Sequence, residues 1–488
     1  MSIKLIQEGA PLSFARRLRL TAGLSWPAMM AQLSSILMQY IDAAMVGRLG
    51  AGDSAAVGLV STTLWLFWGT CSAATVGFSV QVAHRVGAAD YVSARAILRQ
   101  GLVCSLIFGV IMGIAGIAIS SSLPGWLGGD AGISDKASLY FFVFVAALPL
   151  LTLNYLGCGV LRACGNMKVP GGLNVLMCVL DVIFNFFLIF PPREVHLPGM
   201  EITLPGAGMG VLGAALGTVA AEVATACLVL WYLLRREKGM AIWGARSEDM
   251  PERRGKRAFM PVWSVLRNAA KVSSPMMIEH MVICGAQIMV TVIVAPLGMM
   301  AIAANAFAVT AESLCYMPGY GIGDAATTLT GQCYGAGRRD LARKFANLTV
   351  CLGMAVMSMM GLILYIFADE VMRLMSPVDA IVSLGAASLR IEAWAEPMFA
   401  ASIVAYGAMV GVGDTIVPAL MNFGSIWLVR LPLAALLAPS MGLQGVWLAM
   451  CIELTFRGLI FLVRLLRGSW LRKGLHTAPV PMPDESGV

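Results

Sequence analysis

The sequence predicts an all-α integral membrane protein with twelve transmembrane helices, in two six-helix lobes related by a pseudo-twofold axis along the membrane normal. Three observations support this fold class: the composition, the spacing of long apolar runs and an internal repeat. Of the 488 residues, 58% are hydrophobic and only 12% are charged, and the mean hydropathy is +0.80. A chain of this length with so few charges is hard to keep in water, so we expect it to cross a membrane many times.

Twelve apolar runs are long enough to cross about 30 Å of hydrocarbon, which takes roughly 20 helical residues. They cover residues 23–47, 54–83, 97–122, 137–160, 169–190, 209–234, 272–297, 300–330, 346–367, 381–409, 416–438 and 443–466. No short apolar region with a cleavage site follows the basic N-terminus, so the first run is expected to be retained. Extra residues between the fifth and sixth runs, "PPREVHLPGMEITLPGAG", predict an external hairpin.

The basic residues predict the orientation of the helices. Of 34 Lys and Arg residues, 27 fall on the side that holds both termini, three fall inside helices, and four fall on the other side. The positive-inside rule therefore predicts cytoplasmic termini in a multi-pass protein of the plasma (inner) membrane. A polar cytoplasmic linker, 236–262, separates an N-terminal lobe, 1–235, from a C-terminal lobe, 263–470, and a disordered, proline-rich cytoplasmic tail is predicted for 471–488.

The internal repeat has a fixed offset of 248 residues. With that shift, residues 25–95 align without a gap to residues 273–343, and a second aligned block follows at 159–174. Matches outside the common apolar residues include Pro27 with Pro275, Gln39 with Gln287, Gly165 with Gly413, Pro170 with Pro418 and Asn174 with Asn422. Apolar composition inflates chance matches among Ala, Leu and Val but not among Pro, Gln and Asn, so we interpret the repeat as a duplication.

A duplication with an even number of helices places both halves in the same orientation. Two such bundles can enclose a central cavity and rock against each other, which is how alternating access works in secondary transporters. The alternative is a duplicated scaffold without transport. Pro27 and Pro275, at equivalent positions of the two halves, are predicted hinges, although ordinary membrane-helix prolines would look the same.

Polar side chains inside the first lobe indicate an ion site. Asp42 lies within the first predicted helix, where an ionised carboxylate costs about 2.5–3.5 kcal/mol. Asp181 and Asn185 are four residues apart on one face of the fifth helix, and Thr218 lies in the sixth. Close carboxylates can share a proton and oxygen ligands suit Na⁺, so these four residues are predicted to bind the coupling ion, H⁺ or Na⁺. Hydrogen bonds between helices are the alternative.

The second lobe contains acids of its own. Its predicted helices carry Glu279, Glu312, Glu392, Glu396 and Glu453, together with Arg390, Arg430 and Arg457. Ion pairs with arginine are expected for Glu392 and Glu453, but three arginines leave at least one acid without a cationic partner. Glu279 is the predicted unpaired acid, and with Gln287 and Glu392 it is predicted to line the substrate cavity.

Several segments together resemble the multidrug and toxic compound extrusion (MATE) family. They are "PAMMAQLSSILMQYIDAAMVGRLG", "PLGMMAIAANAFAVTAESLCYMPGYGIGDAATTLTGQCYGAGR", "GAMVGVGDTIVP" and "FRGLIFLVRLLRGSW", and the likeness extends from about Leu20 to Trp470. The resemblance implies a two-lobed antiporter that exports organic, often cationic, compounds in exchange for H⁺ or Na⁺, with a role for Asp42. The fifth helix departs from the family order, because Asp181 precedes Asn185 instead of following it.

Other function classes find less support. The sequence has no GxxxxGK[ST] phosphate loop, no HExxH and no GxSxG, and its eleven cysteines form no CxxC pair. We therefore expect no enzyme activity, no ATP, no nucleic acid, no cofactor and no metal beyond a Na⁺ at Asp42, Asp181 and Asn185. A monomer in the bilayer that binds small organic cations is expected. A flippase for a lipid-linked precursor is the main alternative, followed by a receptor-like protein without transport and an intramembrane enzyme.

Overall fold

In this computed structural model, residues 6–7, 12–197, 200–237, 239–242, 260–472 and 474–475 are described. The first lobe consists of six long helices, one short helix and a hairpin. They are α2 (Phe14–Gly47), α3 (Ala51–Gly87), α4 (Tyr91–Ser120), α5 (Leu123–Trp126), α6 (Ala131–Ala163), α7 (Lys168–Ile189), β1 (Arg193–Leu197), β2 (Met200–Leu204) and α8 (Gly210–Arg235).

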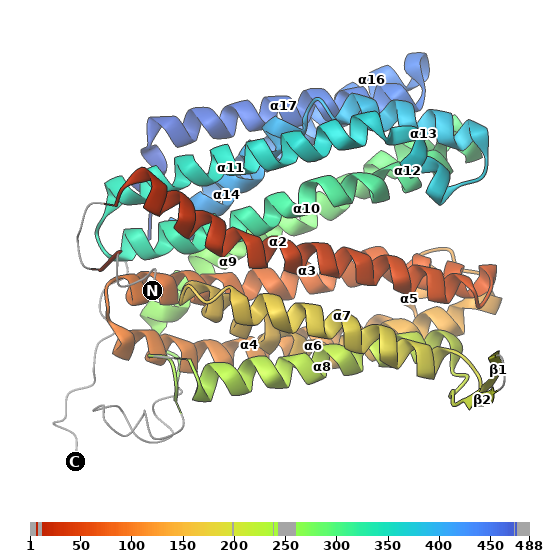
Figure 1. The fold of residues 1–488 in the computed structure, drawn as a ribbon, viewed down its shortest axis with the longest axis horizontal. Coiled ribbons are helices and arrows are strands. Elements are labelled where there is room, and N and C mark those ends of the chain that lie inside the picture. The colour runs from red at the N-terminus through yellow and green to blue at the C-terminus, as the bar shows by residue number, and fades with distance from the viewer. Residues whose placement is uncertain are drawn as a thin grey trace.

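The second lobe repeats this order with more breaks. Its elements are α9 (Trp263–Val294), η2 (Ala295–Leu297), α10 (Met299–Gly335), α11 (Arg339–Ile366), α12 (Ala368–Met375), α13 (Asp379–Glu392), α14 (Glu396–Val412), α15 (Ile416–Ser425), η3 (Ile426–Arg430), α16 (Leu431–Met441), α17 (Leu443–Arg467) and η4 (Ser469–Leu471). In Figure 1 the two lobes form two groups of long, nearly parallel helices. Most of the predicted linker, 243–259, lies outside the described residues.

Helix packing shows the twofold relation between the lobes. Within the first lobe, α2 packs on α7, and the equivalent α9 packs on α15 within the second. Across the boundary, α2 packs on α10 of the other lobe, and α9 packs on α3. This reciprocal exchange is what a pseudo-twofold axis between the lobes produces, and it brings α2, α3, α9 and α10 to the centre of the molecule (Figure 1).

Eleven of the twelve predicted spans have the length and hydropathy of membrane-crossing helices in the described part of the chain. Ten are continuous, and the eleventh is the bent pair α13–α14. The first predicted span, α2, is long enough at 34 residues but falls below the same hydropathy requirement, because Gln, Ser and Asp interrupt its apolar sequence. It still runs beside the other long helices (Figure 1). Along part of α2, polar residues therefore face neighbouring helices.

Two predicted segments differ in detail from the structure. The run 381–409 is not one helix but α13 and α14, which meet at an angle of 60°. Pro397 at the start of α14 has no backbone N–H to donate to the preceding turn, which favours a break at that point. The predicted hairpin forms an antiparallel ribbon in which Arg193 pairs with Leu204 and Leu197 with Met200.

The predicted tail does not begin at residue 471. Leu471 is 8% exposed and Leu475 only 2%, and the Leu475 N–H donates to the Val412 carbonyl at 2.8 Å. Disorder is therefore the wrong description of the described positions 471, 472, 474 and 475. The remaining part of the predicted tail, 476–488, lies outside the described residues.

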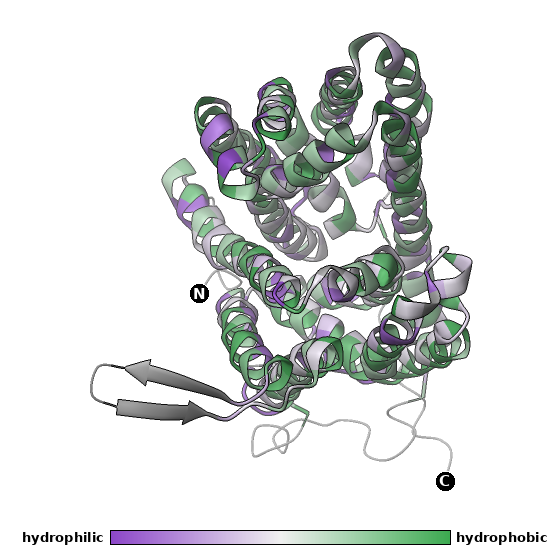
Figure 2. Cartoon of the chain, turned by 90° about the vertical axis from the view of Figure 1, so that its right-hand side faces the viewer, coloured by the Kyte–Doolittle hydropathy of each residue, from purple (hydrophilic) through white to green (hydrophobic). Residues whose placement is uncertain are grey.

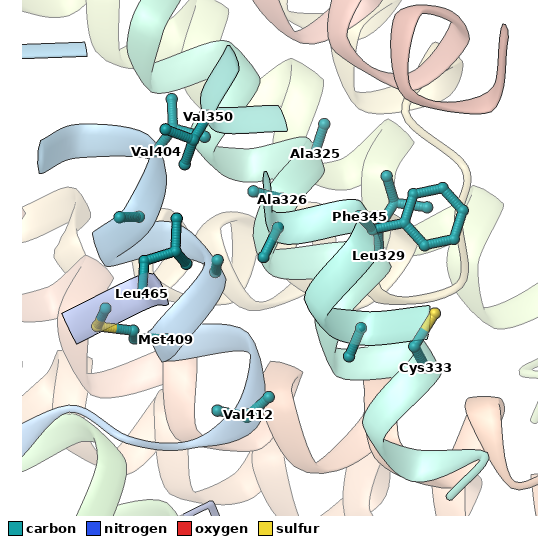
Figure 3. Packing of buried hydrophobic residues seen from close by; sticks show 14 of the residues in the cluster. Ala325, Ala326, Leu329, Cys333, Phe345, Val350, Val404, Met409, Val412 and Leu465 are labelled. Atoms are coloured by element: carbon teal, nitrogen blue, oxygen red, sulfur yellow. The ribbon is translucent and has the colours of Figure 1, made fainter. Parts of the chain in front are cut away.

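Apolar side chains occupy both the interior and the outer surface. Figure 3 shows one interior cluster, in which small alanines of α10 allow α11, α14 and α17 to approach closely around Phe345, Met409 and Leu465. On the outside, Ile107, Ile111 and Ile114 of α4 are 52–63% exposed. Hydrophobic colouring continues along the helices in Figure 2, as expected for a surface in contact with lipid.

Candidate functional site

The four predicted ion-site residues of the first lobe meet around one amide. Nδ2 of Asn185 donates to Oδ1 of Asp42 at 2.8 Å and lies 3.2 Å from both carboxylate oxygens of Asp181. It also lies 3.5 Å from the hydroxyl oxygen of Thr218. Three helices, α2, α7 and α8, therefore contribute to one polar cluster.

Local sequence explains this convergence. Asp181 and Asn185 are one helical turn apart on α7, and both are fully buried. On α8, Gly217 lies so close that a Cβ added there would be 2.1 Å from Oδ1 of Asn185. The absence of a side chain at Gly217 is what allows α7 and α8 to approach around Asn185.

Glu222 belongs to the same neighbourhood but is not among the predicted site residues. It lies one turn after Thr218 on α8 and interacts electrostatically with both Asp42 and Asp181. Its Oε2 atom is buried and has no hydrogen-bond partner among the described residues. The four-residue spacing from Thr218 could have identified it, since that spacing places both side chains on one helix face.

The first-lobe cluster is rich in acceptors and has no cation of its own. Within the described residues, no Lys or Arg forms an ion pair with Asp42, Asp181 or Glu222. The Oδ1 atom of Asn185 is also buried without a partner. Buried carboxylates need compensation, and a proton or a small cation among these oxygen atoms would supply it. No group of three His, Cys, Asp or Glu side chains in the described chain is arranged to hold a metal ion.

A cavity of about 470 Å³ lies between the lobes. Helices α3 and α6 of the first lobe form one wall, and α9, α10, α14, α15 and α17 of the second form the other. Glu279 of α9 lines this cavity, where it accepts hydrogen bonds from the Tyr406 hydroxyl at 2.5 Å and from the Asn422 amide. The structure thus places Glu279 where the sequence predicts it.

The other charges of the cavity wall are paired. Arg162 of α6 contacts Asp324 of α10 at 3.3 Å, so this ion pair joins the two lobes. Arg457 binds Glu453 at 3.0 Å, and its guanidinium lies over the ring of Phe399. Glu279 is the wall carboxylate that has no ion pair within the described residues.

Two predicted cavity residues lie elsewhere. Gln287 is exposed and is not part of the cavity lining, because it lies two turns beyond Glu279 on α9. Glu392 is fully buried inside the second lobe and does not reach the cavity. Its predicted ion pair is also wrong, since Arg390 binds Asp369 instead at 2.5 Å. The predicted pairing of Glu453 is confirmed, with Arg430 and Arg457 both at 3.0 Å.

The two predicted hinge prolines lie inside continuous helices. Pro27 is within α2 and Pro275 within α9. Close backbone contact surrounds Pro27, since a Cβ added at Gly171 would be 2.8 Å from its carbonyl oxygen. The positions are suitable for flexing, and the hinge role stays a prediction.

The lobes also meet below the cavity, at the end where α2 begins and α17 ends. The His84 ring of α3 is within hydrogen-bond distance of the Gly411 carbonyl at 2.9 Å and packs against Tyr334. Nearby, the Gln332 amide of α10 donates to the Ala163 carbonyl of α6 at 2.8 Å. These bonds and the Arg162 ion pair join the lobes at this end of the central cavity.

Comparison with known proteins identifies the family. The MatE family model matches residues 27–187 and again residues 275–436. The chain belongs to the MatE family. The two MatE segments start at Pro27 and Pro275, 248 residues apart, which is the offset of the internal repeat. Each lobe is thus one copy of the MatE unit.

Relatives of this MatE protein span almost its whole length. It is 25% identical over 460 residues to a probable multidrug resistance protein NorM of Thermotoga maritima, covering 93% of each chain. It is 24% identical to the multidrug resistance protein MdtK of Yersinia pestis, covering 92% of this chain and 94% of that one. Both relatives are named multidrug resistance proteins, and the family resemblance drawn from the motifs is confirmed.

Solved MATE structures share the fold. A crystal structure of MATE in complex with MaL6 has a TM-score of 0.85 at 21% identity and covers 96% of this chain and 99% of that one. An outward-facing conformation of a multidrug resistance MATE family transporter has the same TM-score and identity, with 96% and 98% coverage. The two-lobed architecture of this MatE protein is therefore that of solved MATE transporters.

Proposed function

We propose that this protein is a secondary antiporter that exports organic, cationic drugs or toxic compounds in exchange for H⁺ or Na⁺ by alternating access. The observation that carries the proposal is the first-lobe cluster, in which Asp42, Asp181 and Asn185 meet without a cationic partner among the described residues. Such a cluster favours the binding of a proton or small cation, because Asp181 is fully buried and Asp42 half-buried among oxygen atoms. An ion that binds one arrangement of the lobes better than the other shifts the equilibrium between them.

The central cavity supports a cationic substrate. Its two arginines, Arg162 and Arg457, are occupied by Asp324 and Glu453, while Glu279 has only hydrogen-bond partners among the described residues. Tyr155, Tyr320 and Phe399 also line the wall, and aromatic faces attract organic cations. A flippase for a lipid-linked anionic precursor is the second candidate, and it would need free basic groups here.

We place the protein in the plasma (inner) membrane as a monomer with both termini in the cytoplasm. The excess of Lys and Arg on that side supports this orientation. It follows that the contacts of His84 and Gln332 close the cavity toward the cytoplasm, and that the route away from those contacts leads outward.

Gradient-driven transport in inverted vesicles tests the proposal. Uptake of a cationic dye is measured with a pH gradient and a sodium gradient imposed separately, for the wild type, Asp42→Asn and Asp379→Asn. Asp379 is an exposed carboxylate at the start of α13, so its change is the matched control. We expect Asp42→Asn to reduce dye uptake to the level without a gradient while membrane insertion is unchanged.

The proposal fails if Asp42→Asn responds to both gradients like the wild type. Transport of an anionic lipid in place of the dye would favour the flippase. Whichever gradient drives the wild type identifies the coupling ion.

A further inference from the structure

After α17 the chain turns back toward the lower end of the molecule's centre, the end where α2 begins and α17 ends. Gly468 ends this helix with a φ of +68°, a conformation that glycine adopts without strain, and η4 follows directly. Trp470 of η4 is fully buried, and its indole N–H donates to the Leu465 carbonyl at 3.2 Å. The turn is therefore fixed against the second lobe, and it sets the course of the residues that follow.

Segment 474–475 is anchored on the second lobe. The Leu475 N–H donates at 2.8 Å to the carbonyl of Val412, the last residue of α14 (Figure 3). A Cβ added at Gly413 would lie 2.6 Å from the Cβ of Leu475. One added at Gly474 would lie 2.6 Å from the hydroxyl oxygen of Tyr334. Val412, Gly413 and Tyr334 all belong to the second lobe, and the two glycines allow the backbone to approach them closely.

The Leu475 side chain belongs to an apolar cluster that spans both lobes. Leu475 is 2% exposed and shares this cluster with Val80 of α3, Val272 of α9 and Val410 of α14. Three partly buried side chains pack against it, Val76, Met276 and Tyr406. Helix α3 is part of the first lobe, whereas α9 and α14 are part of the second. We call this group the lower cluster.

The lower cluster borders the central cavity. Most of its members also line the cavity, namely Val76, Val80, Met276, Tyr406 and Val410. Leu475 does not line the cavity, and its backbone is bound to Val412, which lies beyond Val410 toward the lower end. Leu475 therefore packs behind the cavity wall at the lower end. Separation of the lobes there divides the cluster, because its members come from both lobes.

Dividing the lower cluster exposes apolar surface. Burial of an apolar side chain is favourable in proportion to the area removed from water, so Leu475 stabilises the arrangement in which the lobes meet. Its backbone hydrogen bond among the described residues stays within the second lobe. The contact across the lobes is therefore apolar, and it can break and re-form without leaving a polar group unpaired.

The first lobe has a corresponding segment after α8, the helix equivalent to α17. Met240 and Ile242 are buried there, and the Ile242 N–H donates to the Leu234 carbonyl at 3.0 Å. Their cluster includes Val265 and Ala269 of α9, a helix of the second lobe. In both halves, residues that follow the last helix join an apolar cluster shared with the other lobe.

We propose that segment 474–475 is a latch, which is anchored on the second lobe and keeps the lower end closed by inserting Leu475 into the lower cluster. It lowers the population of the arrangement that is open at this end. Closure by the latch stands without the proposed transport function, whereas an effect on the rate of transport rests on that function.

A distance between the lobes tests the latch. Lys168 and Asp340 are exposed residues at the lower ends of α7 in the first lobe and α11 in the second. Spin-labelled unnatural amino acids are placed at these two positions, because the eleven native cysteines exclude thiol labels. Double electron–electron resonance then measures the distance in lipid nanodiscs, without substrate or gradient. We expect Leu475→Ala to raise the ratio of long to short distances about tenfold, since it removes most of a buried leucine side chain.

Leu443→Ala is the matched control. Leu443 is also 2% exposed, but its cluster consists of second-lobe residues, so it should leave the distances unchanged. Leu475→Met keeps an apolar side chain of similar volume and should resemble the wild type. Size-exclusion chromatography checks that each variant is folded. Wild-type distances in Leu475→Ala overturn the latch, and so does an equal opening in Leu443→Ala, which would indicate a general loss of packing.

Gly474→Ala tests the anchor in the full-length chain. Its new Cβ would lie too close to the Tyr334 hydroxyl, so the segment must shift. We expect an opening between those of the wild type and Leu475→Ala. Wild-type distances in Gly474→Ala would overturn anchoring through this close contact.

The outcomes separate the latch from the antiporter proposal. If Leu475→Ala opens the lower end while Asp42→Asn responds to both gradients like the wild type, the latch stands and the assigned coupling cluster fails. If Asp42→Asn abolishes gradient-driven dye uptake while Leu475→Ala keeps the wild-type distances, the antiporter stands and the latch fails.

Discussion

The two lobes share one helix arrangement but hold their buried charges differently. In the first lobe, Asp42 and Asp181 gather around the neutral amide of Asn185. In the second lobe, Glu453 is clamped by Arg430 and Arg457. The equivalent of Asp42 at the repeat offset is Val290, and the equivalent of Asp181 is Val429. After duplication, the scaffold was kept while the ionisable residues became different.

This difference separates acids that have a structural role from acids that can gain or lose a proton. A carboxylate that two guanidinium groups bind stays ionised. Removing any member of such a buried group strongly destabilises the folded protein. An acid that shares an amide with another acid can take up one proton without leaving a buried arginine unpaired. The acids of the first lobe therefore fit the proposed ion exchange, whereas Glu453 in the second lobe fits a structural role.

The largest expected effect comes from removing the clamped acid. Glu453→Gln removes the carboxylate that forms the ion pairs of Arg430 and Arg457 among the described residues, and these side chains are only 13% and 10% exposed. Breaking a buried ion pair from one side typically destabilises a protein by about 3–5 kcal/mol. Thermal unfolding in detergent should show a large decrease in Tm.

Asp181→Asn is the corresponding change in the first lobe. It removes an acid that has no cationic partner in the described chain, so the Tm should stay near the wild-type value or rise. Equal destabilisation by the two substitutions would show that the lobes do not differ in the way described here.

A smaller effect is expected from filling the gap that Gly217 leaves beside Asn185. In Gly217→Ala the new Cβ would lie 2.1 Å from Oδ1 of Asn185, so the amide must move away from the acids. Overpacking of this kind typically costs about 1–3 kcal/mol. We expect a moderate loss of Tm together with weaker gradient-driven uptake.

Gly172→Ala serves as the matched control in the same lobe. Gly172 is exposed on α7, and an added Cβ would contact nothing within 4 Å. Alanine is a better helix former by up to about 1 kcal/mol, so stability should be equal or higher and transport unchanged. If Gly217→Ala behaves like this control, the close approach of α7 and α8 is not what positions Asn185.

Much of the fold could be predicted because membrane insertion leaves a strong periodic signal. Long apolar runs and the 248-residue offset both report on helices that cross the bilayer, and the family model matches the same two segments. The site in the first lobe was predictable for a related reason. Acids such as Asp42 and Asp181 are costly inside a membrane, so they stand out from an apolar background.

The second lobe was harder to predict because pairing depends on geometry between helices. The sequence places Arg390 two residues from Glu392, but adjacent helical positions face different directions, and Arg390 contacts Asp369. Glu222 was missed because its acid interacts with residues of other helices, α2 and α7. Gln287 was misplaced because a polar residue near a helix end can face outward instead of into the cavity.

The smallest expected effect concerns the ion pair that joins the lobes. The side chains of Arg162 and Asp324 are 35% and 32% exposed, so this pair should contribute only about 0.2–1 kcal/mol to stability. Its position matters more than its strength, because any bond between the lobes favours the closed arrangement below the cavity. Arg162→Met should therefore leave Tm nearly unchanged but open this end more often.

Native thiols report the opening directly. Cys164 and Cys333 are buried and directly follow Ala163 and Gln332 in the sequence, so we expect their exposure to rise when the lobes separate at this contact. Mass spectrometry after brief maleimide treatment should find both more labelled in Arg162→Met than in the wild type, with the exchanged pair Arg162→Asp/Asp324→Arg partly restoring protection. Arg390→Met breaks an ion pair of similar exposure within the second lobe and should leave labelling unchanged. If labelling also increases in Arg390→Met, the thiols respond to a general loss of stability. The proposed role of the inter-lobe ion pair in closing the cavity would then be refuted.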